Sequence, residues 1–193
     1  MYQIHVCEGV VLGKRGVGEA NVLIFILTHD LGLVRAVARS ARVEHSKLRY
    51  GLEPLTRARF SLVRGKNEWK LTGTEGITRT LMPSEPALAR QAGRVAKLLL
   101  RLIHGEEVAP ALYTSAVEGL SALAAVRSVR EAESVESVLV LKILFHLGYL
   151  PHTPELRGFI DADFFSLELA GEVERSRSLL IRTINESLSA TGL

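Results

Sequence analysis

The Lys and Arg residues of this sequence are spaced in a way that could bind phosphate groups. Residues 33–49 carry five cationic residues against one acidic residue. If this stretch begins as a β-strand, alternate side chains share a face, so Arg35 and Arg39 lie on one side and small apolar residues on the other. A row of guanidinium groups can bind nucleic acid phosphates, although a half-buried strand with a solvated arginine face has the same pattern.

The distribution of charge favours a basic N-terminal module. The formal net charge is only +3 over 193 residues. Residues 1–80, however, contain 13 Lys and Arg against 7 Asp and Glu, whereas the remainder contains 11 against 14. This asymmetry predicts a first module that suits polyanions and a second module that does not.

Composition argues against several classes of protein. With 47% hydrophobic residues the sequence is not that of a disordered chain, and it is long enough for a substantial core. No apolar run approaches the roughly 20 residues needed to cross a bilayer, and the N-terminus lacks a signal-peptide layout. The single cysteine, Cys7, cannot form an internal disulfide. We therefore expect a soluble cytoplasmic protein.

Short β-rich runs separated by turn signals fill the first 75 residues, a pattern typical of a small barrel. The predicted strands are residues 4–12, 22–28, 33–40, 57–64 and 68–75, with a short helix near residues 46–51. Five strands with a helix between the third and the fourth are typical of an OB-fold. In that fold, strands 2 and 3 and two neighbouring loops bind oligonucleotides.

The basic residues fall where an OB-fold binds its ligand. Lys14 and Arg15 belong to the predicted loop 13–19, which follows strand 1, and Arg64 and Lys66 flank the loop after strand 4. Among the aromatic residues, Phe25 and Phe60 fit the core and Trp69 stays unassigned, so the expected binding is more electrostatic than stacking. The candidate DNA-binding residues from this pattern are Lys14, Arg15, Arg35, Arg39, Arg42, Arg64 and Lys66.

Beyond Met82 and Pro83 the hydrophobic period changes from two residues to about 3.6, which predicts helices. The first begins near Pro86, and further helices are predicted at residues 110–126, 134–147 and 172–189. The segment 134–147 is apolar nearly all round, so we place it at the centre of the helices. The sequence thus predicts an α+β protein, with an OB-fold nucleic-acid-binding domain at residues 1–80 and a helical domain at 81–193.

A basic stripe runs along one flank of the first predicted helix. Arg90, Arg94, Lys97 and Arg101 recur at spacings of four and three residues, which places them side by side on a helix. Such a stripe can receive an acidic peptide, although it is also the ordinary pattern of a solvated helix face.

Catalytic and metal-binding patterns are weak in this sequence. The glycines of segment 13–18 lead into a strand and lack the Gly-Lys-Ser/Thr ending of a phosphate loop. His146 and His152 have no third ligand nearby, and Asp161 and Asp163 lie in a loop that we expect to dock its phenylalanines. We therefore expect a protein that is not an enzyme and that has no metal site and no cofactor.

Several short segments follow one another in a distinctive order. In the first part of the chain they are Gly-Glu-Ala-Asn at 18–21, Leu-Thr-His-Asp-Leu-Gly at 27–32, Val-Ala-Arg-Ser-Ala-Arg at 37–42, Ser46 and Leu-Glu-Pro-Leu at 52–55. A later segment is Leu-Lys-Ile-Leu-Phe-His-Leu-Gly-Tyr-Leu-Pro at 141–151. In their order and spacing these segments resemble the RecO family, bacterial recombination mediators that anneal DNA strands. The later segment is similar to the leucine-rich helix of that family, which ends in Gly-Tyr-x-Pro.

This resemblance implies a nucleoid-associated DNA repair protein with an OB-fold and a helical domain. It implies binding of single- and double-stranded DNA, strand annealing, and association with RecR and with the acidic tail of single-strand-binding protein. It also implies an indirect role in loading RecA onto DNA that single-strand-binding protein coats. By position, the implied phosphate contacts are Arg39, Arg42, Lys47 and Arg49, and the candidate surface for the acidic tail is Arg94, Lys97 and Arg101.

The chain departs from the family at one place. Many members carry a four-cysteine zinc element just after Gly-Tyr-x-Pro, whereas residues 152–158 contain no cysteine. The resemblance therefore implies a short form without the metal. Two other functions stay open: a protein adaptor whose helical domain does the main work, and an OB-fold protein that binds RNA.

Overall fold

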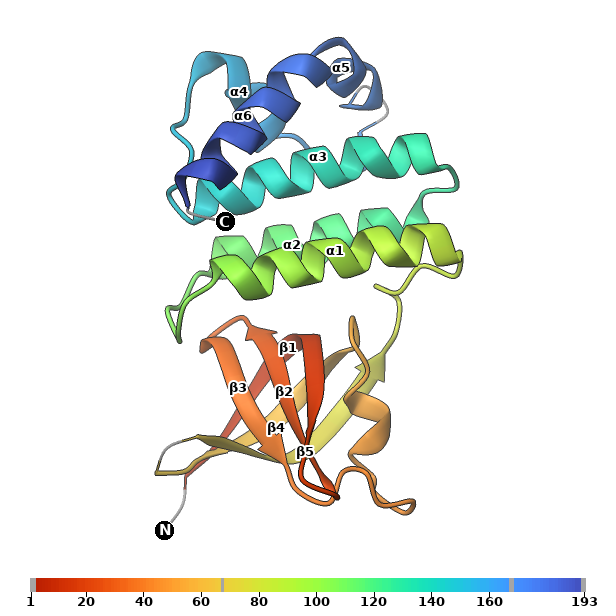
Figure 1. The fold of residues 1–193 in the computed structure, drawn as a ribbon, viewed down its shortest axis with the longest axis vertical. Coiled ribbons are helices and arrows are strands. Elements are labelled where there is room, and N and C mark those ends of the chain that lie inside the picture. The colour runs from red at the N-terminus through yellow and green to blue at the C-terminus, as the bar shows by residue number, and fades with distance from the viewer. Residues whose placement is uncertain (1–2, 67, 167–168, 192–193) are drawn as a thin grey trace.

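The computed structural model describes residues 3–66, 68–166 and 169–191, and its first half is a closed β-barrel (Figure 1). The strands are β1 (Ile4–Val17), β2 (Asn21–Thr28), β3 (Gly32–Ala38), β4 (Arg57–Arg64) and β5 (Trp69–Thr78). They follow one another round the barrel in the order β1-β2-β3-β5-β4. The short 3-10 helix η1 (Arg49–Gly51) lies between β3 and β4. This is the OB-fold that the sequence predicted.

Strand β1 closes the barrel because it is long enough to pair with two neighbours. Its first half pairs with β4 and its second half with β2, with a shift of register between Val11 and Gly13. Gly9 lies where the two pairings meet, and a Cβ atom there would be 2.6 Å from Cγ2 of Ile26. The predicted loop at 13–19 is therefore wrong in extent: residues 13–17 continue the strand, and only residues 18–20 turn.

Alternation of side chains separates the barrel interior from its outer face, as predicted for strands β3 and β4. In β4, Ala58, Phe60 and Leu62 are buried in the interior, while Arg57 and Arg59 are exposed. The interior side chains of β3 are Val34, Ala36 and Ala38. The opposite face of β3 carries the exposed Arg35 between the buried Leu33 and Val37.

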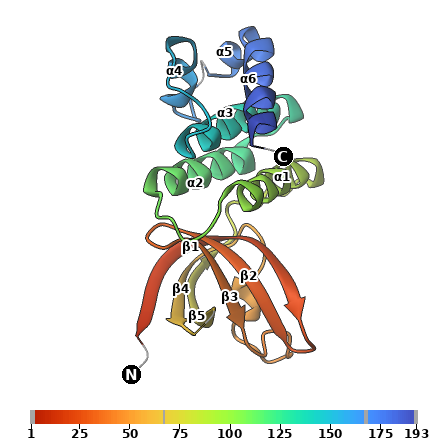
Figure 2. The same cartoon turned by 60° about the vertical axis from the view of Figure 1, so that its left-hand side comes forward.

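Within the described residues, six helices follow the barrel in stacked layers (Figures 1 and 2). They are α1 (Pro86–Leu102), α2 (Pro110–Ala125), α3 (Val129–His146), α4 (Pro154–Ile160), α5 (Leu169–Arg175) and α6 (Arg177–Ala190). Helices α1 and α2 form the layer next to the barrel, α3 lies on them, and α4 to α6 cover the other side of α3. Helix α3 thus occupies the centre, as its apolar sequence predicted.

The helix boundaries differ from the sequence prediction at three places. Helix α3 begins five residues earlier than predicted, at Val129, because the Oγ of Ser128 accepts a hydrogen bond from the backbone N–H of Glu131 at 3.2 Å. The expected helix at 172–189 is two helices that meet at Ser176. Helix α4 forms in a stretch predicted to be irregular. Within the described residues, no helix is long and apolar enough to cross a membrane.

One hydrophobic core joins the barrel to the helices. Barrel residues Val10, Leu12, Leu27, Leu33 and Leu55 belong to the same buried cluster as the inner side chains of α1, α2 and α3. The side chains of α1 in this cluster include Leu88, Ala92, Val95, Leu99 and Leu102. The division into domains at 1–80 and 81–193 stays a prediction. The shared core links the two predicted domains.

Candidate nucleic-acid interface

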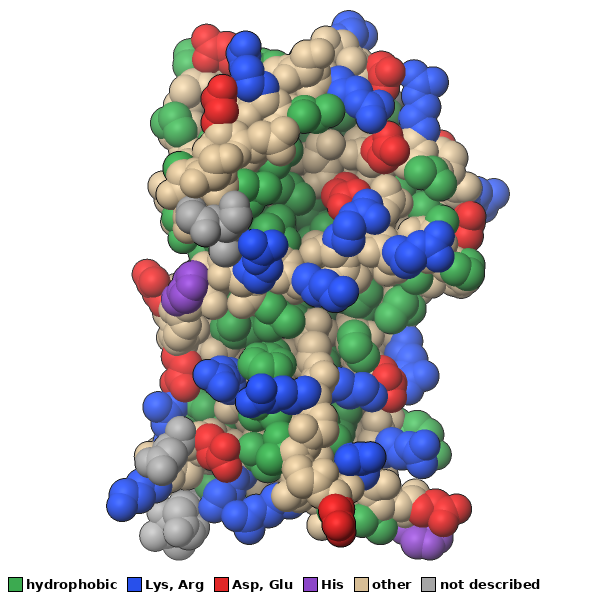
Figure 3. All heavy atoms as spheres, viewed as in Figure 1, with side chains coloured by type: hydrophobic (Ala, Val, Ile, Leu, Met, Phe, Trp, Pro, Cys, Tyr) green, Lys and Arg blue, Asp and Glu red, His purple; other side chains and the backbone are tan. Residues whose placement is uncertain are grey.

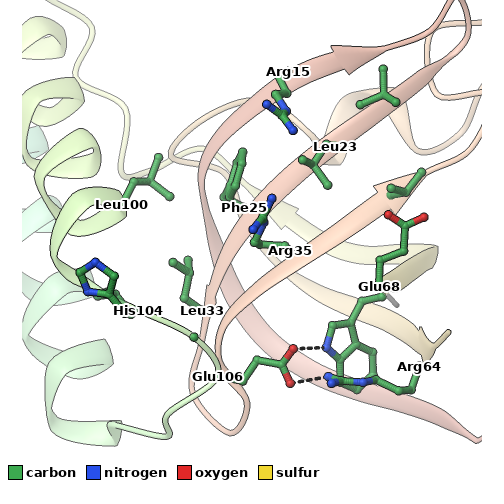
Figure 4. A pocket seen from close by; sticks show the side chains of 15 residues that line it. Arg15, Leu23, Phe25, Leu33, Arg35, Arg64, Glu68, Leu100, His104 and Glu106 are labelled. Atoms are coloured by element: carbon green, nitrogen blue, oxygen red, sulfur yellow. Dashed lines mark hydrogen bonds and ion pairs between the residues drawn. The ribbon is translucent and has the colours of Figure 1, made fainter. Parts of the chain in front are cut away.

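A pocket of about 670 Å³ lies on the outer face of β1, β2 and β3, beside the end of α1 (Figure 4). Strands β2 and β3 and the β4–β5 connection contribute to it, so it occupies the face where OB-folds bind oligonucleotides. The lining residues are Arg15, Val17, Leu23, Phe25, Leu33, Arg35, Val37, Arg64, Glu68, Trp69, Leu100, Ile103, His104, Gly105 and Glu106.

Arg15 and Arg35 supply the cationic part of the barrel side of the pocket. Arg35 lies opposite Phe25 in the β2–β3 ladder, and its guanidinium carbon is 5.7 Å from the centroid of the Phe25 ring. Both arginines are exposed, and neither forms an ion pair with the part of the chain that the structure describes. Their hydrogen-bond donors are therefore available to an anion such as a phosphate.

Arg64 is held differently, in a cluster with Trp69 and Glu106. Its guanidinium stacks on the Trp69 ring at 4.8 Å from the centroid and forms an ion pair with the carboxylate of Glu106. The other carboxylate oxygen of Glu106 accepts a hydrogen bond from Nε1 of Trp69 at 2.9 Å. Figure 4 shows Glu106 reaching from the segment after α1 toward the barrel strands. One glutamate thus occupies two donors of the pocket.

The segment 103–109, which joins α1 to α2, is seated on the barrel by a glycine. Gly32, the first residue of β3, has a φ of +66°, and a Cβ atom there would lie 2.3 Å from the carbonyl oxygen of Glu107. Only glycine allows the two backbones to approach this closely. Leu100 of α1 and His104 of this segment line the helical side of the same pocket (Figure 4).

Two of the predicted DNA-binding residues lie away from this pocket. Lys14 points to the side of β1 opposite to Arg15, because neighbouring residues of a strand alternate, and its Nζ lies 2.8 Å from a carboxylate oxygen of Glu53. Nη1 of Arg42 donates to the carbonyl of Gly18 at 3.3 Å. These two cations are therefore engaged within the protein.

The other predicted residues of the barrel are exposed on two separate edges. Arg39, Lys47 and Arg49 lie in the segment between β3 and β4, and Lys66 lies in the β4–β5 turn. Figure 1 shows these two connections on opposite sides of the barrel. The structure thus brings Arg15, Arg35 and Arg64 together, whereas Arg39, Arg42, Lys47 and Arg49 lie between β3 and β4, outside this pocket.

The basic stripe of α1 is partly engaged. Nε and Nη2 of Arg94 donate to the two carboxylate oxygens of Glu136, on α3, at 3.2 and 2.9 Å. Lys97 and Arg101 are exposed and have no ion pair within the described residues. Figure 3 shows Lys and Arg side chains gathered over α1 and again over the barrel face below it.

Sequence reasoning missed four residues of the pocket. Phe25 was assigned to the core but is partly exposed in the pocket, and Trp69 was unassigned. His104 and Glu106 were not considered, because their proximity to the barrel results from non-local packing of α1. The only local sequence feature that could have pointed to this segment as part of the site is the acidic pair at 106–107, which directly follows a glycine.

His146, one of the histidines singled out in the sequence, lies partly buried in the helical bundle next to Lys142. Nε2 of His146 lies 3.0 Å from Oγ of Ser115, and burial, with the nearby Lys142 ammonium, lowers the pKa of His146. Lys142 is itself buried, which lowers its pKa, and its Nζ donates to the carbonyl of Ala162 at 2.5 Å. The described residues contain no group of three possible metal ligands.

The loop after α4 docks one of its two phenylalanines. Phe164 is buried, and its ring centroid lies 4.6 Å from Nζ of Lys142. Phe165 is exposed. Residues 154–160, which follow Pro151 and contain no cysteine, form helix α4.

The fold and the pocket define a class: an OB-fold protein with a basic, ligand-accessible barrel face, joined through one core to a helical bundle. The family model described as "Recombination protein O N terminal" matches residues 1–78, the barrel. Together with the relatives described next, this match supports the assignment of the chain to the RecO family.

Three relatives, each called DNA repair protein RecO, illustrate the similarity. The Heliobacterium modesticaldum protein is 30% identical over 116 residues, which cover 58% of this chain and 42% of the relative. A Dehalococcoides mccartyi protein is 33% identical over 107 residues, or 55% and 42% of the two chains. The Exiguobacterium sibiricum protein is 28% identical over 168 residues, or 85% and 66%. The chain thus spans less than half the length of the first two relatives.

Proposed function

We propose that this protein is a non-enzymatic DNA-binding protein of DNA repair. It binds single- and double-stranded DNA, promotes the annealing of strands and, with RecR, helps RecA to replace single-strand-binding protein. The observation that carries this proposal is that Arg15 and Arg35, which have no ion pair within the described residues, lie in a pocket on the barrel face that OB-folds use for oligonucleotides. Similarity to proteins of the RecO family supports the role in repair.

The pocket suits a flexible strand better than a rigid duplex. It is concave and combines cations with the partly exposed ring of Phe25, so a phosphate can bind Arg15 or Arg35 while a base contacts the ring. The exposed Arg39, Lys47 and Arg49, in the segment between β3 and β4, are further cations that backbone phosphates of either strand type can reach. We therefore assign the pocket to single strands and these three residues to backbone contacts.

The exposed cations of α1 support a partner proposal. Lys97 and Arg101 project from the helix without ion pairs in the described part of the chain, and Arg94 is paired with Glu136. We assign Lys97 and Arg101 to the acidic tail of single-strand-binding protein, with Arg94 joining them if its pair opens.

One binding comparison tests the function. Labelled single-stranded DNA, duplex DNA and RNA of the same sequence are titrated with the full chain at several salt concentrations, and binding is followed by fluorescence anisotropy. We expect tight binding of single-stranded DNA at low salt that weakens steeply with added salt. A preference for RNA would support the alternative of an RNA-binding protein, and absence of binding at low salt would contradict the proposal.

The adaptor function remains the second candidate because the exposed Lys97 and Arg101 of α1 lie outside the barrel pocket. It predicts capture of an acidic tail peptide in the absence of DNA. Retention of a peptide that ends in the acidic tail, lost in the Lys97→Gln/Arg101→Gln variant, would favour this function. The matched control is the Arg175→Gln/Arg182→Gln variant, which removes two charges from α5 and α6, where both residues are exposed.

A further inference from the structure

The cluster of Arg64, Trp69 and Glu106 has no role in the function proposed so far. Trp69 is the only tryptophan of the chain and is 5% exposed, packed edge-on against His5 with ring centroids 5.2 Å apart. Arg64 covers the Trp69 ring, and Glu106 binds both side chains. The three residues come from β4, from β5 and from the segment after α1.

We propose that Arg64 is a phosphate-binding subsite for single-stranded nucleic acid that Glu106 blocks in the free protein. A carboxylate and a phosphate each present two oxygens that can accept from the planar donor fork of a guanidinium, so Glu106 occupies Nη1 of Arg64, a donor that a backbone phosphate would use. The inference rests on the proposed function, because it assigns the ligand of the pocket in which Arg64 lies.

The contact between Glu106 and Arg64 is of a kind that a ligand can displace. The Arg64 side chain is 56% exposed and that of Glu106 41%, so water and salt reach both partners of the ion pair. Exposed ion pairs contribute little to stability, and a doubly contacted phosphate is a stronger competitor than water. Glu106 therefore acts as an internal competitor rather than as a structural link.

The backbone around Glu106 allows its side chain to leave while the segment stays docked. The carbonyl of Glu107 remains packed against Gly32, which fixes the segment on the barrel. On the other side, Gly105 has a φ of +84°, and a Cβ atom there would meet no atom within 4 Å. Rotation of the Glu106 side chain away from Trp69 thus needs no movement of the helices.

A charge-matched pair of variants tests this inference in the full chain. Glu106→Gln removes the competing charge, whereas Glu107→Gln removes the same charge from an exposed neighbour that contacts neither Arg64 nor Trp69. We expect Glu106→Gln to bind a single-stranded oligonucleotide about 3- to 10-fold more tightly at low salt, with about 0.7 added to the salt slope for one extra phosphate contact. Glu107→Gln should change the affinity less than twofold.

The same titration in an Arg64→Gln background makes the result specific. If Glu106 blocks Arg64, the gain from Glu106→Gln disappears when Arg64 is already neutral, which is a coupling that a double-mutant cycle measures. Equal gains for Glu106→Gln and Glu107→Gln, or a gain that persists without Arg64, would overturn the inference. Failure of the unmodified protein to bind any oligonucleotide would instead overturn the proposed function.

Discussion

The arginine residues of this protein differ in whether an acidic side chain of the protein pairs with them. This difference separates candidate ligand contacts from arginines with a structural role. Arg15 and Arg35 are exposed in a pocket and unpaired within the described residues, whereas Arg57 donates to Glu8 and Arg64 to Glu106. The alternation of β3 predicted the exposed side of Arg35 from sequence alone. The acidic partners of Arg57 and Arg64 lie 49 and 42 residues away in the chain, so no local pattern could reveal them.

At the residue scale, we predict that His146 makes stability depend on pH. Burial and the nearby Lys142 ammonium lower its pKa in the folded protein below the ordinary value of 6.5. Below that pH the unfolded chain binds the proton more readily than the folded protein, so the free energy of unfolding falls as the pH decreases.

The measurement is urea denaturation between pH 5 and pH 8 for the unmodified protein and for His146→Gln. The variant should lose less stability on acidification, because it has no proton to bind at this position. His45→Gln, which changes an exposed histidine, serves as the control. A pH profile unchanged by His146→Gln would contradict the prediction.

Secondary structure elements were predicted well where a pattern was local and poorly where pairing or packing decides their ends. The bounds of β4 were predicted correctly, because Arg57 to Arg64 alternate cleanly between polar and buried positions. The length of β1 was predicted incorrectly, because residues 13–17 are extended through their pairing with β2. Helix α4 was missed since only Leu156, Phe159 and Ile160 bury it against the bundle.

At the element scale, the docking of segment 103–109 predicts unequal costs for two glycine substitutions. Gly18 and Gly32 both have positive φ, at +60° and +66°, so alanine at either position strains the backbone by about 1–2 kcal/mol. Alanine at Gly32 would also bring its Cβ to 2.3 Å from the Glu107 carbonyl, whereas at Gly18 the space is empty. Gly32→Ala should therefore destabilise the protein more than Gly18→Ala in chemical denaturation, and equal losses would argue against the docked segment.

Helix packing predicts opposite effects for two other glycines. Gly93 in α1 has no atom within 4 Å of a would-be Cβ, so Gly93→Ala should stabilise the protein by about 0.5–1 kcal/mol through helix propensity. Gly119 in α2 packs against Leu139 of α3, whose Cδ1 would lie 2.5 Å from the new Cβ, so Gly119→Ala should destabilise it by about 1–3 kcal/mol. Thermal denaturation measures both, and stabilisation by Gly119→Ala would contradict the observed α2–α3 contact.

The whole molecule is organised by a core that crosses from barrel to helices. Hydrophobic periodicity predicted both halves, because each period is a local property of the chain. It gave no sign that Leu12, Leu27 and Leu33 of the barrel share a buried cluster with α1 and α2. The same packing positions the end of α1 and segment 103–109 at the pocket, which explains why sequence reasoning found the barrel side of the site and missed the helical side.

At this scale, we predict that barrel and helices unfold together. Trp69 fluorescence reports the barrel, since it is the only tryptophan, and the circular dichroism signal at 222 nm reports the helices. Because the two parts share buried leucines, both signals should change at the same denaturant concentration with one cooperative transition. A barrel transition clearly separated from the helical transition would show that the shared core does not couple them.

The central claim is that Arg15 and Arg35 bind nucleic acid phosphates on the barrel face. The most direct measurement is the salt dependence of single-stranded DNA affinity for Arg15→Gln/Arg35→Gln and for a control, Arg59→Gln/Arg182→Gln. The control removes two exposed arginines that lie outside the pocket. We predict that the pocket variant loses about 10-fold or more in affinity and about 1.4 in salt slope, for two lost phosphate contacts, while the control stays near the unmodified protein. Equal losses in the two variants would contradict the assignment of this face.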